Sequence, residues 1–277
     1  MKMKKYLLIT TLLPLFLNAN NYFVTLGNVN GIHVQSNQEN SNNVEDNNNS
    51  ITPNSEEWLT YFHSIGQLTE ANHLNEWNTL QLHAFIGNGE RNSINDESLP
   101  QSSFGVTEIF DFLVENTVMT HVNFMQGVKN INSNFAFVNA ELNDITGLSD
   151  LNPIQNNLSL QLQINKLDNL NGLQNITSLK SLNLQINELK NLNELINLEN
   201  VIEYIYIRYN PELTDISGLQ NLSLSTVKVY IDDPTQYTTK IPIGSTFCNS
   251  LSNFSTDSDS YPVYYQGNKV PFGNICN

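Results

Sequence analysis

Apolar residues recur at fixed intervals through the second half of the chain. One set comprises Leu160, Leu162, Leu167, Leu170, Leu173 and Ile176, with Asn165 between the second and third members. The same pattern returns one repeat later at Leu182, Leu184, Leu189, Leu192, Leu195 and Leu198, with Asn187 in the asparagine position. A period of about 20 to 50 residues is typical of a solenoid, in which each repeat buries its apolar face only against its neighbours.

The pattern extends in both directions over residues 118–232. Its asparagine positions, which we expect to form a structural ladder, are Asn123, Ala140, Asn165, Asn187, Asn210 and Asp232. Ala140 and Asp232 replace the asparagine. The spacing is nearly constant from Asn165 onward, whereas the step before Ala140 is shorter and the step after it is longer. The first unit, which starts at Val118, is the most irregular.

Each part of the unit predicts a local structure. Two apolar residues separated by one polar residue predict a short strand with one face inward. The asparagine follows the strand, where its side chain can both donate to and accept from backbone groups that would otherwise be buried unpaired. The apolar residues that follow recur every third position, which favours 3₁₀-like turns over a long α-helix.

These residues resemble the leucine-rich repeat family, and the period of about 22 residues resembles that of its bacterial internalin-like subclass. Three segments are similar to that subclass's convex-side motif: Leu142–Leu148, Leu167–Leu173 and Leu213–Leu219. The resemblance implies an α/β solenoid with short parallel strands on the concave face, flanked by an N-terminal cap and a C-terminal cap. It also implies recognition of a protein or another ligand, often at a cell surface, and no reaction.

The outward strand positions change character along the repeat. The earlier units carry small or amide side chains, whereas the last two carry Tyr204, Tyr206, Arg208, Lys228 and Tyr230. Tyrosine and arginine are enriched at binding hot spots because each combines a large contact area with a polar group. We therefore expect these five residues to form the partner-binding surface. The alternative is that tyrosine simply favours strands and that the cap covers part of them.

The N-terminal part of the chain divides into three segments. Residues 1–19 resemble a secretory signal peptide, with Lys2, Lys4 and Lys5 before an apolar run too short to span a bilayer. Residues 20–54 are rich in Asn and predict a disordered linker. Residues 55–117 are apolar without a repeat and predict an N-terminal cap. We expect an exported protein that is secreted, periplasmic or peripherally attached to the cell surface, with no transmembrane segment after signal removal.

The last segment, residues 233–277, is predicted to be a C-terminal cap containing a hairpin with Gly267 and Asn268 at its turn. It holds the chain's two cysteines, Cys248 and Cys276. In an exported chain such a pair predicts a disulfide. The alternatives are a catalytic thiol and a metal pair, and the metal pair is disfavoured because zinc normally takes four ligands.

Charge and candidate chemistry narrow the function further. The formal net charge of −15 disfavours nucleic acid as a partner. Asp257 and Asp259 could ligate calcium weakly, but a solvated acidic turn explains them better. No nucleophile, base and orienting group come together in the pattern, so we expect no enzyme, no cofactor and no metal.

Three hypotheses follow from the sequence. The leading one is an exported recognition module that binds a protein or glycan through its concave face. The second is a non-catalytic structural or self-associating envelope protein. The third is an enzyme, for which the short segment 233–277 after the last repeat leaves little room.

Overall fold

The computed structural model describes residues 57–58, 60–61, 84–86, 96, 99–110 and 112–277, all of which belong to one unit comprising residues 36–277. The expected signal peptide (1–19) and linker (20–54) lie outside the described residues, as does much of the region 55–117.

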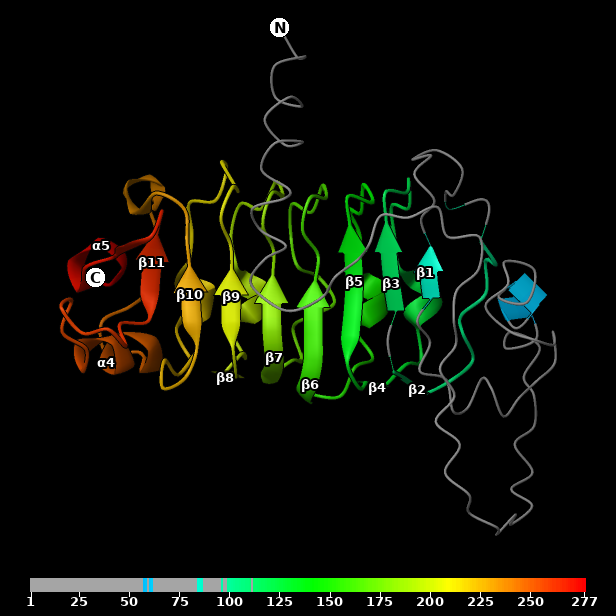
Figure 1. Ribbon diagram of the computed structural model, residues 1–277, viewed down its shortest axis with the longest axis horizontal. Helices are drawn as coiled ribbons and strands as arrows, with labels where there is room; N and C mark the ends of the chain where they lie inside the picture. Colours follow the sequence, from blue (N-terminus) through cyan, green and yellow to red (C-terminus); the bar gives the residue numbers. More distant parts are fainter. Residues whose placement is uncertain (1–56, 59, 62–83, 87–95, 97–98, 111) are drawn as a thin grey trace, which may run out of the picture. The chain divides into compact units, whose positions relative to one another are not determined.

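The main sheet runs along the described residues as a row of parallel strands in chain order, and it ends with one antiparallel strand (Figure 1). Its strands are β1 (Ala84–Ile86), β3 (Phe112–Glu115), β5 (Asn134–Val138), β6 (Ile154–Gln161), β7 (Ser178–Asn183), β9 (Tyr204–Tyr206), β10 (Lys228–Tyr230), β11 (Val263–Tyr265) and β12 (Asn268–Lys269). A further strand, β8 (Asn200–Val201), pairs with the first residues of β7. The short strands β2 (Glu108–Ile109) and β4 (Asn130–Ile131) form a separate parallel pair.

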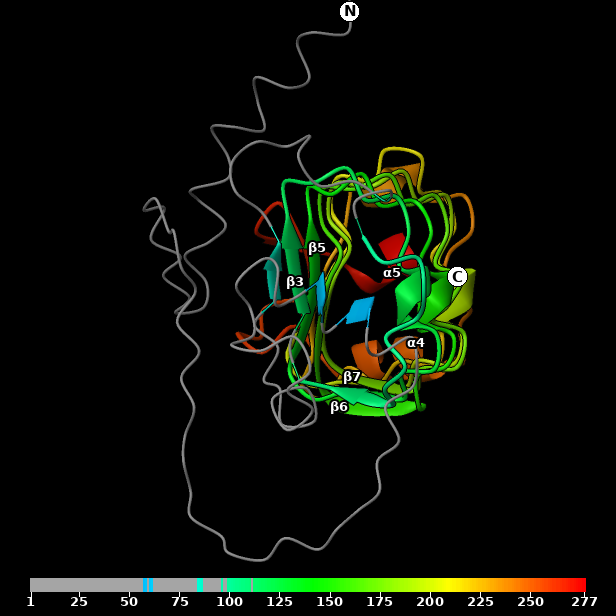
Figure 2. The same ribbon diagram turned by 90° about the vertical axis from the view of Figure 1, so that its right-hand side faces the viewer.

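Successive strands are joined by turns that superpose when the unit is viewed along the row (Figure 2). The result is a parallel β-solenoid of about five turns with little helix. The predicted 3₁₀ turns are confirmed opposite the strands at η3 (Asn123–Met125), η4 (Thr146–Leu148), η5 (Asn193–Leu195) and η6 (Ser217–Leu219). The only other helices of the described chain are η7 (Pro234–Gln236), α4 (Thr246–Ser252), α5 (Phe272–Ile275) and short pieces before residue 97, so the helical share is smaller than the α/β expectation implied.

The core of the solenoid is a continuous column of apolar side chains. Alternation along each strand turns one set of residues inward: Leu160, Leu182 and Ile205 are fully buried and are in register on neighbouring strands. Leucines of the 3₁₀ turns close the column from the other side. At its N-terminal end, Trp58 packs its ring 4.5 Å from Phe104 and 5.1 Å from Phe124, measured between ring centroids.

The chain leaves β3, β5, β6, β7 and β9 through one residue with left-handed backbone conformation. These residues have φ between 54° and 66° and directly precede the ladder positions; they are Asn116, Asn139, Ile164, Ile186 and Tyr209. Such a φ is unfavourable for β-branched side chains, so the chain adopts it at Ile164 and Ile186 because the surrounding turns require it.

The expected frame of the first unit is wrong. Phe112 and Val114 of β3 are in register with Phe135 and Phe137 of β5, so the ladder residue before Ala140 is Thr117. Asn123 is exposed and begins η3 instead. The step from Thr117 to Ala140 matches the step from Asn187 to Asn210, so the irregular short step disappears. The parallel sheet therefore extends before residue 118.

The long step between Ala140 and Asn165 has a different cause, an irregularity in β6. The register between β6 and β7 shifts between Gln155 and Ser159. At this point the buried side chain of Gln155 replaces a backbone partner: its Oε1 accepts from the Ile131 N–H at 3.3 Å, and its Nε2 donates to the Lys129 carbonyl at 2.8 Å. The amide thus bridges turns whose backbones do not pair there.

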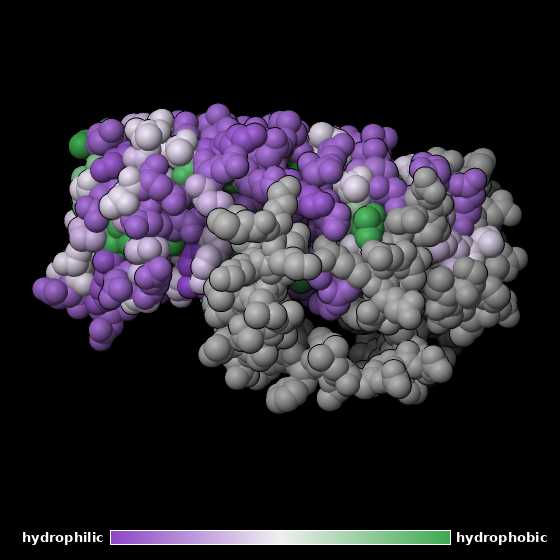
Figure 3. All heavy atoms as spheres, turned by 90° about the horizontal axis from the view of Figure 1, so that it is seen from above, coloured by the Kyte–Doolittle hydropathy of each residue, from purple (hydrophilic) through white to green (hydrophobic). Residues whose placement is uncertain are grey.

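The surface of the described residues is mainly hydrophilic, with isolated hydrophobic side chains, when seen from the side at which the strands end (Figure 3). No helix in the part of the chain that the structure describes has the length and apolar character needed to span a bilayer.

Candidate binding surface

The outer face of the sheet, which is the face opposite the core, carries the predicted partner-binding residues. In β9 and the two residues after it, Ile205 and Ile207 are fully buried. Tyr204, Tyr206 and Arg208 are half-buried on the opposite face. Lys228 and Tyr230 alternate with the buried Val229 in the same way. The structure therefore places all five predicted residues on one face of two neighbouring strands.

Strand register then brings tyrosines from three strands into one column. Tyr206 pairs with Tyr230, and Tyr230 pairs with Tyr264 of β11. The ring centroids of Tyr206 and Tyr230 are 4.5 Å apart and those of Tyr230 and Tyr264 are 5.5 Å apart, with interplanar angles of 28° and 23°. Tyr204 adds a fourth ring, 4.7 Å from Tyr206. The rings cover one another's faces, and their edges and hydroxyl groups remain for contact with a ligand.

Cations lie against this column. The Arg208 Cζ is 5.3 Å from the ring centroid of Tyr206 and 5.5 Å from that of Tyr230. The Lys228 Nζ is 5.6 Å from the ring centroid of Tyr264 and donates to the carbonyls of Ser260 and Tyr261 at 2.9 and 2.8 Å. Such cation–π contacts hold the charged groups beside the rings.

Lys269 completes the set because it faces Tyr264 directly across the β11–β12 pair. Directly opposed residues share a sheet face. We define the tyrosine–cation surface as Tyr204, Tyr206, Tyr230, Tyr264, Arg208, Lys228 and Lys269.

The pKa values on this surface reflect burial and crowding. Burial raises the pKa of Tyr206 to about 12, with a further contribution from Tyr230 and an opposing one from Arg208. The phenol is therefore a hydrogen-bond donor at neutral pH. Burial lowers the pKa of Lys228, and the nearby positive charge of Lys269 lowers it further. The two ammonium groups thus form one local concentration of positive charge.

The outer face is polar on the earlier strands. In the tyrosine column, the positions before Tyr206 are Gln161 and Asn183. The Gln161 Nε2 donates to the Tyr204 hydroxyl at 3.3 Å, and the Gln185 Nε2 donates to the Asn183 Oδ1 at 3.1 Å. The amides therefore contact one another and the first tyrosine.

Three of the predicted ladder asparagines are buried between turns. The Asn165 Oδ1 accepts from the N–H groups of Ala140 and Leu142 at 3.0 and 3.1 Å, and its Nδ2 donates to the Phe137 carbonyl at 2.7 Å. Asn187 and Asn210 make equivalent bonds one and two turns later. Asp232 accepts from the N–H groups of Tyr209 and Asn210. These residues hold successive turns together.

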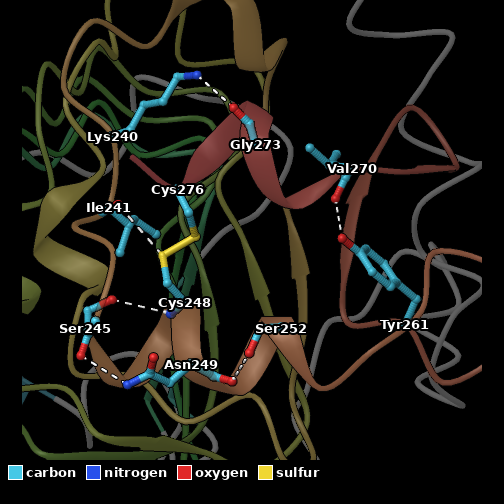
Figure 4. The surroundings of a disulfide bond; sticks show 11 residues. Lys240, Ile241, Ser245, Cys248, Asn249, Ser252, Tyr261, Val270, Gly273 and Cys276 are labelled. Carbon is cyan, nitrogen blue, oxygen red and sulfur yellow. Dashed lines mark hydrogen bonds between the residues drawn. A yellow bond between two sulfur atoms is a disulfide. The ribbon is translucent and has the colours of Figure 1, made fainter.

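The predicted disulfide is confirmed between Cys248 and Cys276 (Figure 4). Cys248 lies in α4, whose N-terminus is capped by Ser245, and Cys276 follows α5. The bond holds together two segments that are distant in the chain, beside the backbone bridge between Ile241 and Cys276.

Tyr264 and Lys269 are the surface residues that the sequence did not indicate. Tyr264 lies more than one repeat beyond Tyr230, so the period of the earlier units does not reach it. The predicted hairpin is confirmed, with Gln266 and Gly267 at its turn rather than Gly267 and Asn268. Its alternation could have suggested Tyr264 as outward, but its pairing with β10 is visible only in the structure.

Among the described residues, no group of three or more His, Cys, Asp or Glu side chains is placed to hold a metal ion. No family model matches the chain, and no curated protein or solved structure is significantly similar to it.

Proposed function

We propose that this chain is an exported recognition module of the leucine-rich repeat type that binds a protein or glycan partner through the outer face of its sheet. The repeat period, the asparagine ladder and the 3₁₀ turns opposite the strands support the leucine-rich repeat assignment. Within that family's architecture the outer face of the sheet corresponds to the concave side.

The tyrosine–cation surface is the observation that carries this proposal. Four tyrosines from three strands form a continuous row with centroid distances of 4.5 to 5.5 Å between neighbouring rings, and three cations lie on the same face. Core packing does not explain this row, because the tyrosines lie on the face of the sheet opposite the apolar core. Clustered tyrosine and arginine side chains are typical of binding hot spots.

Export is supported by two independent features. Residues 1–19 have the composition of a signal peptide. The Cys248–Cys276 disulfide is stable in an oxidising compartment, where such bonds form and persist. Mass spectrometry of the N-terminus of the protein recovered from outside the cytoplasm tests this, and an intact Met1 terminus there would contradict signal cleavage.

The binding proposal is tested by affinity capture with the oxidised protein against cell-surface extracts. We expect a partner that binds wild type and is lost with Tyr206→Ala/Tyr230→Ala, with an affinity decrease of about thirtyfold or more, as for a hot-spot pair. Ile202→Ala is the control, because Ile202 is a large exposed side chain outside this surface.

A partner retained equally by the double variant would exclude this surface as the binding site. Self-association instead of partner capture, detected as a mass that rises with concentration in light scattering, would favour the structural envelope hypothesis.

A further inference from the structure

The tyrosine–cation surface differs in charge from the rest of the described protein. Four lysines form ion pairs with carboxylates of a neighbouring turn: Lys129 with Asp150, Lys166 with Glu141, Lys180 with Glu203 and Lys190 with Asp168. Lys228 instead donates to two backbone carbonyls, and the ammonium group of Lys269 makes no hydrogen bond or ion pair within the described residues. These two ammonium groups therefore have no carboxylate partner among the described residues, as is also true of Lys240, which donates to the Gly273 carbonyl.

Carboxylates also lie near this surface. Asp232 is electrostatically coupled to Arg208, and Asp259 is coupled to Tyr264. Lys228 and Lys269 are coupled to each other as like charges. Two like charges held together on a surface favour an anionic group between them.

The geometry of the rings indicates how a ligand would contact them. Tyr206, Tyr230 and Tyr264 stack face to face, so their faces are closed to apolar side chains of a partner. What remains is a row of hydroxyl groups, one on each strand. Neighbouring strands are about 4.8 Å apart, which sets the spacing of this row.

That spacing favours one class of polymer. An extended peptide advances about 3.3 Å per residue and places a side chain on the same face only at every second residue. Its side chains therefore do not match hydroxyl groups about 4.8 Å apart. One sugar unit of a linear polysaccharide is about as long as the spacing between tyrosine hydroxyl groups on neighbouring strands. The hydroxyl groups of the sugar both donate and accept hydrogen bonds.

We propose that the tyrosine–cation surface binds a linear acidic polysaccharide that crosses β9, β10 and β11. The hydroxyl groups of Tyr206, Tyr230 and Tyr264 bond to successive sugars, and Lys228 and Lys269 bind their carboxylate or sulfate groups. This inference rests on the proposed recognition function and specifies the ligand class for the same surface.

The test is biolayer interferometry with the oxidised protein immobilised and four polymers in solution. Alginate presents carboxylates, dextran sulfate presents sulfates, dextran is neutral, and poly-L-glutamate is an acidic peptide. We expect alginate or dextran sulfate to bind at least about tenfold more tightly than dextran and poly-L-glutamate. The stronger of the two identifies the anionic group.

Two conservative variants locate the site. Tyr230→Phe keeps the ring stack and removes one hydroxyl, and we expect about fivefold weaker binding. Lys269→Gln removes one cation that makes no described bond, and we expect about tenfold weaker binding and a smaller dependence on salt. Lys180→Gln is the control, since it removes the same charge from an ion pair elsewhere.

The inference is overturned if neither acidic polysaccharide binds, if dextran or poly-L-glutamate binds as tightly, or if Lys269→Gln has no more effect than Lys180→Gln. If capture of a partner from extracts still depends on Tyr206 and Tyr230 while neither polysaccharide binds, the ligand class is wrong and the recognition function stands. If neither assay gives a ligand, both proposals fail.

Discussion

At the residue scale, the ladder position shows how one side chain decides the energetics of a turn. Asn165, Asn187 and Asn210 both accept from backbone N–H groups and donate to backbone carbonyls. Asp232 occupies the last ladder position and accepts from Tyr209 and Asn210, but an ionised carboxylate has no proton to donate. Burial also raises the pKa of Asp232, with those two N–H groups and Arg208 opposing the shift.

We predict that Asp232→Asn stabilises the protein by about 1 kcal/mol at pH 7, because removal of a desolvated charge outweighs the loss of one of the two N–H bonds, which the two carboxylate oxygens accept separately. A pKa raised in the folded state means that the charge costs stability above that pKa and that the cost disappears as the pH falls through it. The gain should therefore shrink as the pH falls toward the ordinary value of 3.8. Thermal unfolding of Asp232→Asn and wild type at pH 7 and at pH 3.8 measures this difference in stability.

Asp233→Asn is the matched control for this change. The pKa of Asp233 is lowered by the hydroxyl and N–H of Thr235, so its charge is favoured in the folded state. The same substitution one residue along should give no gain at pH 7. An equal stabilisation by both variants would show that relief of general negative charge, rather than the ladder position, is responsible.

A second residue-scale feature is the glycine of the 3₁₀ turns. A Cβ at Gly218 would lie 1.8 Å from the Leu192 carbonyl oxygen of the preceding turn, and one at Gly147 would lie 2.0 Å from the Val122 carbonyl oxygen. Backbone, rather than a flexible side chain, occupies that space. Glycine therefore sets how closely successive turns stack at these positions.

We predict that Gly218→Ala lowers the stability by about 2 kcal/mol, since the turn must move away from its neighbour. Urea unfolding monitored by circular dichroism measures the change. Gly273→Ala in α5 is the control, because a Cβ there meets nothing within 4 Å. Equal midpoints for the two variants would contradict the role assigned to Gly218.

At the element scale, the C-terminal end of the sheet departs from the repeat pattern of the earlier strands. β11 extends the parallel sheet but follows β10 only after an excursion longer than one repeat, and the antiparallel β12 follows it. The disulfide joins α4, which lies within this excursion, to the residue after α5. In a solenoid each turn contacts only its neighbours, so a perturbation at one end is expected to stay local.

We predict that Cys248→Ser/Cys276→Ser lowers the stability of the C-terminal segment by about 3 kcal/mol, the value typical for closing a loop of this length. Hydrogen exchange should become faster in residues 241–277 and remain slow in β6 and β7. The oxidised wild type is the reference. Faster exchange of equal size throughout all strands would show instead that the solenoid unfolds as a single unit.

At the scale of the whole molecule, charge repulsion opposes the regular stack. The formal net charge is −15, while the four lysine–carboxylate pairs between neighbouring turns are exposed or partly exposed. Exposed pairs contribute little to stability and are screened by salt. Long-range repulsion is therefore the larger of the two effects at low ionic strength.

We predict that raising NaCl from about 10 to about 150 mM at pH 7 increases the thermal midpoint, because the Debye length falls from about 30 to about 8 Å. The same comparison near pH 4.5, the isoelectric point of the sequence, is the control and should show little change. A midpoint that falls with salt at pH 7 would mean that the ion pairs outweigh the repulsion.

By itself, the sequence determined the solenoid, the inward and outward strand positions, the 3₁₀ turns and the disulfide. Each of these depends on local periodicity or on cysteine count, which can be read without knowing what lies beside a strand. The frame of the first unit was wrong because Thr117 lacks the asparagine that marks Asn165 and Asn187, and the pattern therefore fell on Asn123.

Only the tertiary structure decided which strands are neighbours and how their residues are registered. It placed Tyr264 beside Tyr230 and Lys269 beside Tyr264, although the period breaks between these residues. It also showed that the side chain of Gln155 bonds to backbone groups where the backbones themselves do not pair. The physical reason is that strand pairing is a contact between segments distant in the chain. Periodicity fixes which way a side chain points, whereas packing of the whole stack fixes what it meets.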